Sequence, residues 1–389
     1  MSILRTPTTY TLADAVLIRV LSNVHVGVGY SGELVDLPIQ RDEFGFPAIF
    51  SSSIKGALKT SLLYAFMNTL GSYRKAKYAV NALLGPDPEE GESFESSIAI
   101  LDAYLLAIPT RSLRGIYAYV TSPTLLKRFL ERIELCSKFI KVQGESSLNN
   151  FKKIQGTLEK LINEAKDVGV DEALCVGECS EVVIEQPEPF KGKVLLIEEF
   201  LLHIKTPSVG EMNEKNNLSG ILNILGIDKP LLILHDDIAG DVINRSLIRI
   251  TRIRLRRDTK TVERGGLWTE EYVPIKTVLH TVFLYKRPPL TDNFVKNVLR
   301  EFSNKNVDKV NDETYLEALE MLSVLKKEHV EELKKLLQSS TIIEVHTTLV
   351  EGIRRRVWEA ISNVLQGFII LGGKETIGKG IVELKLLTS

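Results

Sequence analysis

Residues 16–41, VLIRVLSNVHVGVGYSGELVDLPIQR, carry the clearest information on the fold class of this chain. The first ten are rich in β-branched residues and end at a glycine cluster, which predicts a strand over 16–25. The three glycines that follow spell G-x-G-x-x-G, the pattern of a dinucleotide-binding loop. Such a loop must open directly into a helix. The next residues, ELVDLP, predict no helix, so we expect no dinucleotide site here.

The rest of the chain mixes helices with strands that look antiparallel. Ser53 is a plausible N-cap of a helix in which apolar residues recur at helical spacing. Without regular βαβ alternation, this mixture predicts an α+β fold. Further helices are expected at 148–167, within 286–345 and at 350–366. Strands are expected at 194–197, 231–234, 247–256 and 381–387.

Length and composition exclude several classes of protein. The 389 residues are enough for two domains, or for one domain with large insertions. Basic and acidic residues number 49 and 50, so overall charge cannot hold a nucleic acid, and any such site must be a local basic surface. No apolar run approaches the ~18 residues of a membrane span. The N-terminus does not read as a secretory signal, so we expect a cytoplasmic location and no membrane partner.

The three cysteines, Cys136, Cys175 and Cys179, predict no special chemistry. An odd, low count argues against a disulfide framework. The C-x3-C pair could begin a zinc site, but no second Cys/His pair follows at finger spacing. We therefore expect small buried side chains at 175 and 179.

Two local features suit a phosphate backbone. Residues 373–379 match G-x4-G-K, but position 380 is glycine instead of the hydroxyl residue of a phosphate-binding P-loop, and a strand follows. Residues 373–379 therefore predict a glycine-rich loop with unhindered backbone amides and two lysines. Residues 249–264 hold seven basic and two acidic residues, an excess of five, followed by Trp268 and Tyr272. This run is either a solvated ribbon face or a nucleic-acid track with stacking aromatics.

Several segments, taken in order, resemble one protein family. They are 25–29 with 35–41, 45–47 with 52–59, 108–115, 266–274, and 372–380. Together they resemble the backbone subunits of the type III-B (Cmr) CRISPR effector complexes, in the RAMP superfamily. The resemblance spans roughly 15–285 and 346–389, and it predicts a core with thumb and insertions over 1–285 and 346–389. It leaves 286–345 as an inserted helical subdomain whose role is open.

The resemblance implies a ferredoxin-like (RRM-like) core with a protruding thumb, in copies that stack along a guide RNA as a filament. It places Asp36 at the target-RNA linkage that is cut, with His25, Glu270 and Tyr272 around it. From the residues alone, Asp36 could instead cap a turn, His25 could be structural, and Glu270 and Tyr272 could simply share a strand face. The guide-RNA side would comprise Ser53, Lys55, Lys59, Arg111, Ser112, Gly372, Gly373 and Lys374. Position 59 is more commonly arginine in the family.

The leading hypothesis is thus an endoribonuclease that works within a guide-RNA complex. The target's own 2′-hydroxyl would attack, assisted by a divalent metal ion, Mg²⁺ or Mn²⁺. Asp36 would either position the metal or take the proton, and no metal ligand is assigned. Expected partners are CRISPR guide RNA, complementary target RNA, further copies of the chain and other Cmr subunits. Two alternatives stay open: a non-catalytic architectural subunit, or a standalone guide-processing endoribonuclease, whose chemistry usually relies on histidine.

Overall fold

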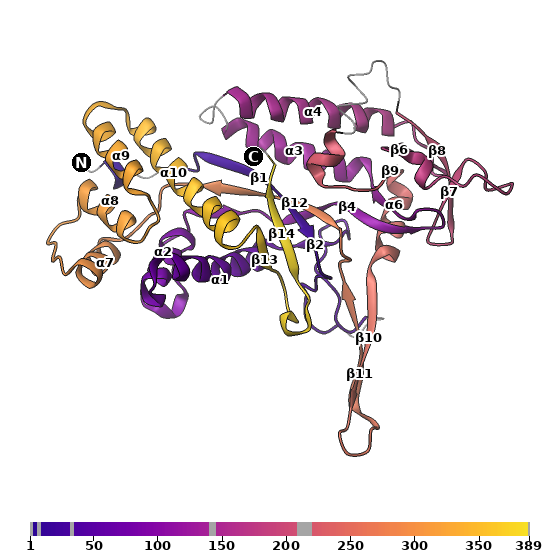
Figure 1. Cartoon of the computed structure of the whole chain (residues 1–389), viewed down its shortest axis with the longest axis horizontal. Helices are drawn as coiled ribbons and strands as arrows, with labels where there is room; N and C mark the ends of the chain where they lie inside the picture. The colour runs from indigo at the N-terminus through magenta and orange to yellow at the C-terminus, as the bar shows by residue number, and fades with distance from the viewer. Residues whose placement is uncertain (1–2, 6–8, 32–34, 140–144, 208–219, 388–389) are drawn as a thin grey trace.

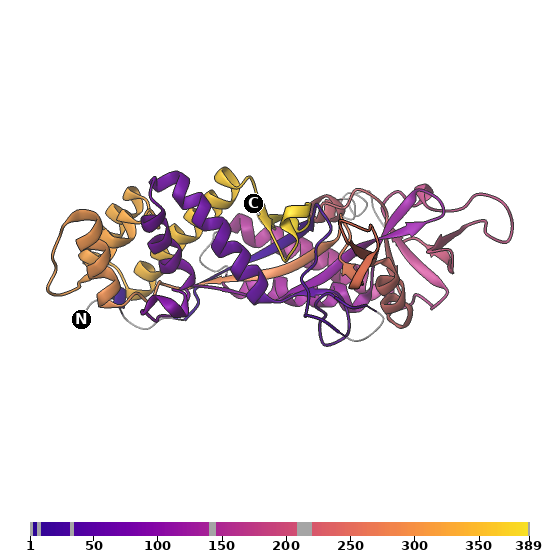
Figure 2. The same ribbon diagram turned by 90° about the horizontal axis from the view of Figure 1, so that it is seen from below.

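The computed structural model describes residues 3–5, 9–31, 35–139, 145–207 and 220–387. Helices α7 to α9 lie at one end of its long axis and strands β7 and β8 at the other (Figures 1 and 2). The strands are β1 (Leu12–Val20), β2 (Ala48–Ile49), β3 (Ile98–Ile100), β4 (Ala103–Ser112), β5 (Ile116–Thr121), β6 (Glu172–Val176), β7 (Lys193–Leu196), β8 (Phe200–Lys205), β9 (Leu231–Leu234), β10 (Ile248–Leu255), β11 (Val262–Tyr272), β12 (Val278–Tyr285), β13 (Phe368–Ile370) and β14 (Ile381–Leu386). The helices are α1 (Ser51–Leu70), α2 (Tyr73–Leu84), α3 (Pro123–Phe139), α4 (Glu145–Ala165), α6 (Asp236–Ser246), α7 (Asp292–Ser303), α8 (Asp312–Met321), α9 (Lys327–Ser339) and α10 (Ile342–Glu359). This mixture confirms the α+β prediction.

The centre of the molecule is an antiparallel run of strands in the order β14-β1-β12-β4. Strand β1 is buried on both faces, because its alternate residues belong to two different apolar cores. Val16 and Ile18 pack into the core that includes α1 and α10, while Ala15 and Leu17 pack into the core of α3 and α4. The sheet is therefore covered by helices on both sides.

The segment predicted as a helical insertion is helical, and it does not have a core of its own. Leu316 of α8 and Leu333 of α9 belong to the same buried cluster as Leu58 of α1 and Val350 of α10. Helix α10 starts before the expected boundary at 345, and earlier than the helix predicted at 350–366. The domain boundary itself stays a prediction.

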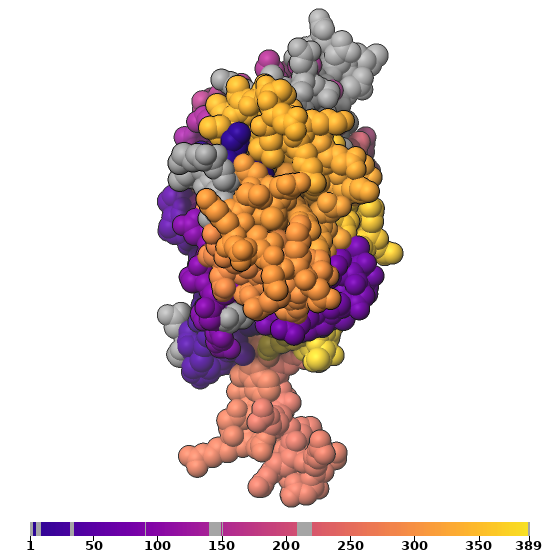
Figure 3. Space-filling view, turned by 90° about the vertical axis from the view of Figure 1, so that its left-hand side faces the viewer, coloured from indigo at the N-terminus to yellow at the C-terminus, as the bar shows by residue number. Residues whose placement is uncertain are grey.

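A two-stranded hairpin, β10–β11, forms a separate sheet that projects from the body (Figures 1 and 3). The period-two alternation of 247–256 predicted this strand, and the structure confirms it. Its outer part is exposed on both faces and contains most of the basic run 249–264. None of the described helices is both long and apolar enough to cross a membrane.

Three local expectations are wrong. The first strand ends at Val20, five residues before position 25. Helix α1 is capped at Phe50, so Ser53 lies inside its first turn and is not the N-cap. Cys175 and Cys179 form a disulfide, because the turn after β6 brings their Cα atoms to 6.0 Å, within bridging range. Cys136 is free and buried.

Candidate active site and RNA interface

Strand β11 is the element on which the predicted catalytic residues meet. Three loops contact the inner half of β11 and Val273, the residue that follows the strand. They do so through isolated β-bridges and side-chain contacts. Val24 pairs with Val273, and Leu37 pairs with Glu270 in parallel. The loop after β13 joins them, since the Gly373 N–H donates to the His25 carbonyl at 3.1 Å. The structure therefore assembles one site from segments around 25, 36, 270 and 373.

Asp36 is held beside β11 by its own carboxylate. Its Oδ2 accepts a hydrogen bond from the Thr269 N–H at 2.7 Å. The Leu37 N–H donates to the Thr269 carbonyl at 3.0 Å, which fixes the backbone next to the aspartate. The side chain is half-buried, so one side of it faces solvent. The Asp36 carboxylate thus accepts a hydrogen bond from a backbone N–H of β11 and is still accessible to a ligand.

Glu270 is a buried carboxylate that receives four donors. Trp268 Nε1 lies 2.6 Å from its Oε1 and Arg252 Nε lies 3.2 Å from its Oε2. The Tyr272 hydroxyl and the Lys374 ammonium also donate to it. Burial opposes ionisation, but these donors outweigh it and hold the pKa of Glu270 at about 2. A carboxylate with so low a pKa is a poor proton acceptor near neutral pH, and it is suited to orienting Lys374 and Arg252.

Tyr272 and Glu270 project from the same face of β11, as their alternation predicted. The Tyr272 side chain is buried, and burial raises its pKa above the usual value. Arg252 Nη2 donates to its hydroxyl at 3.3 Å. Lys379 lies over its ring, 5.4 Å from the centroid. Glu270 and Tyr272 therefore lie at the centre of a cluster of cations at the base of the hairpin.

His25 is buried at this site and packs against the C-terminal glycine loop. Its Nδ1 lies 2.7 Å from the Glu271 carbonyl, which can only accept, so Nδ1 carries the proton. A Cβ on Gly27 would lie 2.7 Å from the His25 Nε2. A Cβ on Gly372, whose φ is +78°, would lie 2.2 Å from the His25 carbonyl oxygen. Glycine at both positions allows the close packing of His25, which sequence reasoning missed.

The residues predicted for the guide-RNA side are not brought together at one place. Lys55 lines a cavity of about 550 Å³ with Ser51, Ser52 and Lys286, at the start of α1. Burial, with the charge of Lys59, lowers the pKa of Lys55. Lys59 is engaged with Asp87, at 2.6 Å. Ser53 accepts a hydrogen bond from Gln40 at 3.3 Å.

The remaining guide-side candidates divide into two groups. Arg111 and Ser112 end β4, where Arg111 is paired with Glu198 at 3.0 Å and Ser112 is buried opposite Leu196. Gly372, Gly373 and Lys374 belong instead to the Asp36 site. Lys374 is paired there with Glu270.

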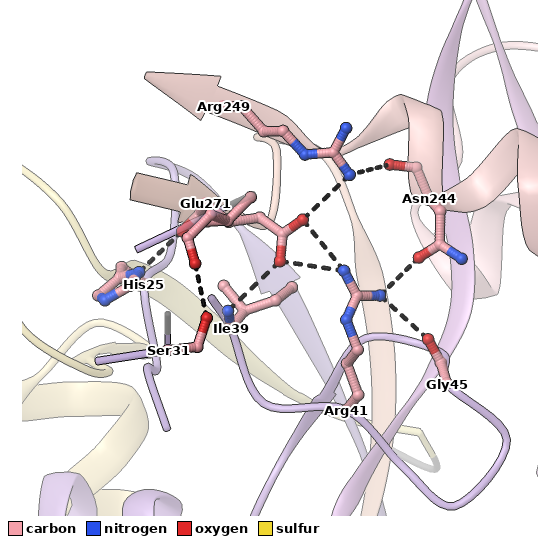
Figure 4. A network of polar contacts seen from close by, with 9 residues as sticks. His25, Ser31, Ile39, Arg41, Gly45, Asn244, Arg249 and Glu271 are labelled. Atoms are coloured by element: carbon pink, nitrogen blue, oxygen red, sulfur yellow. Dashed lines mark hydrogen bonds and ion pairs between the residues drawn. The ribbon is translucent and has the colours of Figure 1, made fainter. Parts of the chain in front are cut away.

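Sequence reasoning also missed a second polar network on the other face of β11 (Figure 4). There the Glu271 carboxylate meets Arg41 and Arg249. The sequence held a signal for this network. Arg41 is the last residue of the D-x-P-I-Q-R segment, and Glu271 is the neighbour of Glu270 in the strand, so its side chain points to the opposite face. Among the described residues, no group of three or more His, Cys, Asp or Glu side chains could hold a metal ion.

Comparisons with known proteins agree with this arrangement. The RAMP superfamily model matches residues 17–383. The CRISPR system CMR subunit Cmr4 of Saccharolobus solfataricus is 31% identical over 388 residues, which are 98% of each chain. The CRISPR system Cmr endoribonuclease Cmr4 of Pyrococcus furiosus is 31% identical over 289 residues, 73% of this chain and 86% of that protein.

Solved structures point the same way. A chain in the cryo-EM structure of the type III-B Cmr-beta bound to cognate target RNA is 28% identical, with a TM-score of 0.61. The match covers 98% of this chain and 99% of that one. The apo state gives 27% identity and the same TM-score, with coverage of 97% and 98%. This chain therefore belongs to the RAMP superfamily and, within it, to the family of the Cmr4 subunits.

Proposed function

We propose that this chain is the backbone subunit of a type III-B effector, binds guide RNA, and cleaves complementary target RNA at Asp36. The observation that carries the proposal is the half-buried Asp36 carboxylate, fixed by the N–H of Thr269, the residue before Glu270, which in turn pairs with Lys374 and Arg252. The relatives support it, since one is named an endoribonuclease and another is a chain of a type III-B Cmr-beta structure bound to cognate target RNA. The proposal includes a cytoplasmic location and assembly with further copies and other Cmr subunits.

The finer fold assignment is part of the same proposal. The strand order β14-β1-β12-β4, with α1 following β1 and α10 preceding β14, supports a ferredoxin-like core. The segments between β4 and β12 then form an insertion on that core, and the β10–β11 hairpin is its thumb. The hairpin contributes Arg252, Trp268 and Glu270 to the site, so the thumb and the catalytic cluster share one strand.

The RNA's own 2′-hydroxyl would attack the adjacent phosphate and form a 2′,3′-cyclic phosphate, while the bond from phosphorus to the 5′-oxygen of the next nucleotide breaks and that oxygen leaves as a 5′-hydroxyl with a proton from water. Asp36 would take the proton of the attacking hydroxyl or hold a divalent ion. Lys374 and Arg252, oriented by Glu270, offset the charge that develops on the phosphate. His25, with Nδ1 bonded to the Glu271 carbonyl, packs against the site, and a part for it in the proton transfer stays a prediction.

A divalent ion, Mg²⁺ or Mn²⁺, fits a site of this kind without a three-ligand protein cluster. Mg²⁺ is commonly held by one or two carboxylates together with substrate phosphates. Asp36 is the residue that would hold it here. When bound, the ion would stabilise negative charge on the phosphate oxygens.

Guide RNA would be held mainly at the start of α1 and along the outer hairpin. Lys55 faces a cavity there and no carboxylate of the described residues pairs with it within 4.0 Å. Ser53, two residues before Lys55 in α1, lies near Gln40. Lys59 and Arg111 would have to leave their acidic partners to contact a phosphate.

The architectural alternative differs only in whether the assembled complex cuts. The guide-processing alternative gains no support, because the one histidine at the site is buried and internally bonded. The test is to assemble the chain with guide RNA and the other Cmr subunits and to add labelled complementary or unrelated RNA, with Mg²⁺ or EDTA. Cuts in the complementary RNA that require Asp36 support the proposal. Intact target in fully assembled, guide-loaded complexes would favour the architectural role.

A further inference from the structure

The buried Glu271 lies on the face of β11 opposite Glu270. Its side chain is 2% exposed. Arg41 Nη2 lies 3.0 Å from both of its oxygens, Arg249 Nη2 lies 3.3 Å from Oε1, and the Ile39 N–H lies 3.4 Å from Oε2. A buried carboxylate is tolerated when donors compensate it in this way. It touches none of the residues proposed to meet the scissile phosphate.

Arg41 connects this carboxylate to two other parts of the molecule (Figure 4). Its Nη1 donates to the Gly45 carbonyl at 3.0 Å and to the Asn244 side chain of α6 at 2.5 Å. One guanidinium thus joins β11, the loop that follows Asp36 and the helix that precedes the hairpin. The planar fork of arginine suits such a bridge, and lysine could not make all of these bonds.

The segment between Asp36 and Arg41 is attached to β11 at both ends. At one end the Asp36 carboxylate accepts from Thr269, and the Glu271 N–H donates to the Leu37 carbonyl at 3.0 Å. At the other end stands the Arg41–Glu271 pair. The first attachment is the isolated Leu37–Glu270 bridge, next to Asp36, and beyond it the described segment is held to β11 through the Glu271 side chain, by Arg41 and by the Ile39 N–H.

We infer that Glu271 and Arg41 are positioning residues that hold the Asp36 segment in register on β11. The inference rests on the proposed function for its catalytic readout. Displacement of a catalytic group by about 1 Å can lower a rate roughly a hundredfold. Breaking the pair should therefore lower the single-turnover cleavage rate at least about tenfold, with target affinity and guide retention unchanged.

The test compares Glu271→Gln and Arg41→Met with the double variant in assembled, guide-loaded complexes. Arg41→Met leaves the buried Glu271 carboxylate with Arg249 as its remaining cation, and Glu271→Gln leaves the partly buried Arg41 guanidinium without its carboxylate. Each single change should therefore lower stability, whereas the double change removes both charges of the pair. If the pair acts by position, the double variant regains thermal stability but still cuts slowly. Glu199→Gln, which breaks the exposed Glu199–Arg245 pair, is the matched control and should cut at the parental rate.

Amide hydrogen exchange of Leu37 and Glu271 provides a readout that needs no cleavage. We expect these two amides to exchange faster in the double variant than in the parent, even though the double variant has regained thermal stability. Recovery of the parental rate by the double variant, or unchanged exchange at both amides, would overturn the inference. So would a changed salt dependence of RNA binding, which would show that Arg41 contacts RNA directly. A parental complex that does not cut contradicts the proposed function, while the exchange result still decides the positioning role.

Discussion

Replacing the carboxylate of Glu270 should remove a specific part of the pH dependence of stability. The folded pKa is about 2, against 4.5 for an ordinary glutamate, and the side chain is 2% exposed. At about 1.36 kcal/mol per pKa unit, this carboxylate contributes about 3 kcal/mol to the free energy of unfolding at neutral pH. Because its folded pKa is lowered, the contribution is complete above pH 4.5 and is lost as the pH falls toward 2. Roughly 2 kcal/mol should be gone by pH 3.

The measurement is urea unfolding of the parent chain and of Glu270→Gln at pH 7 and pH 3. Other carboxylates titrate in both proteins, so the difference between the two isolates Glu270. The parent should lose about 2 kcal/mol more than the variant over this range. Glu199→Gln removes an exposed carboxylate and should follow the parent within about 0.5 kcal/mol. Parallel losses in the parent and in Glu270→Gln would refute the view that the four donors hold this carboxylate ionised.

Asp36→Ala should abolish target cleavage while guide retention, measured by filter binding, stays at the parental level; a variant that still cuts at the parental rate would remove Asp36 from the active site. Lys55→Ala should lower the slope of log affinity against log salt for single-stranded guide RNA by about 0.7, one phosphate contact, and an unchanged slope would count against that contact. Gly372→Ala should lower the free energy of unfolding by about 1–3 kcal/mol, because its Cβ would lie 2.2 Å from the His25 carbonyl oxygen at a φ of +78°. A thermal midpoint equal to that of Gly373→Ala, where a Cβ meets open space, would contradict that expectation.

Features set by local periodicity could be predicted from the sequence, as the Glu270–Tyr272 pair shows. The two residues alternate within a strand and so share a face, and the structure places both in one cluster. The start of α1 could not be predicted in the same way. The Ser51 N–H donates to Asp102 at 2.6 Å, and the Phe50 N–H donates to the Gln40 amide at 2.7 Å. These distant side chains satisfy the helix end that Ser53 was expected to cap.

The protein partner of Lys374 could not be predicted for a related reason. Its glycine-rich surroundings favoured a phosphate ligand, and the structure pairs it with a carboxylate 104 residues away in the sequence. Asp36 was identified through the family resemblance, whereas its bond to Thr269 joins residues 233 positions apart. Such contacts depend on how loops cross a strand, and neither composition nor spacing encodes that crossing.

The shared apolar core has a consequence for how the chain unfolds. Leu4 at the N-terminal turn, Leu316 in the helical segment, Leu58 in α1 and Leu384 in the last strand belong to one buried cluster. Because these four regions share one core, we expect them to unfold as one cooperative unit. A destabilising change deep in α8 should then raise the population of open states at the start of α1, where guide RNA is proposed to bind. The stability of the helical end would then also report on how firmly the start of α1, the proposed guide-RNA site, is held in the folded state.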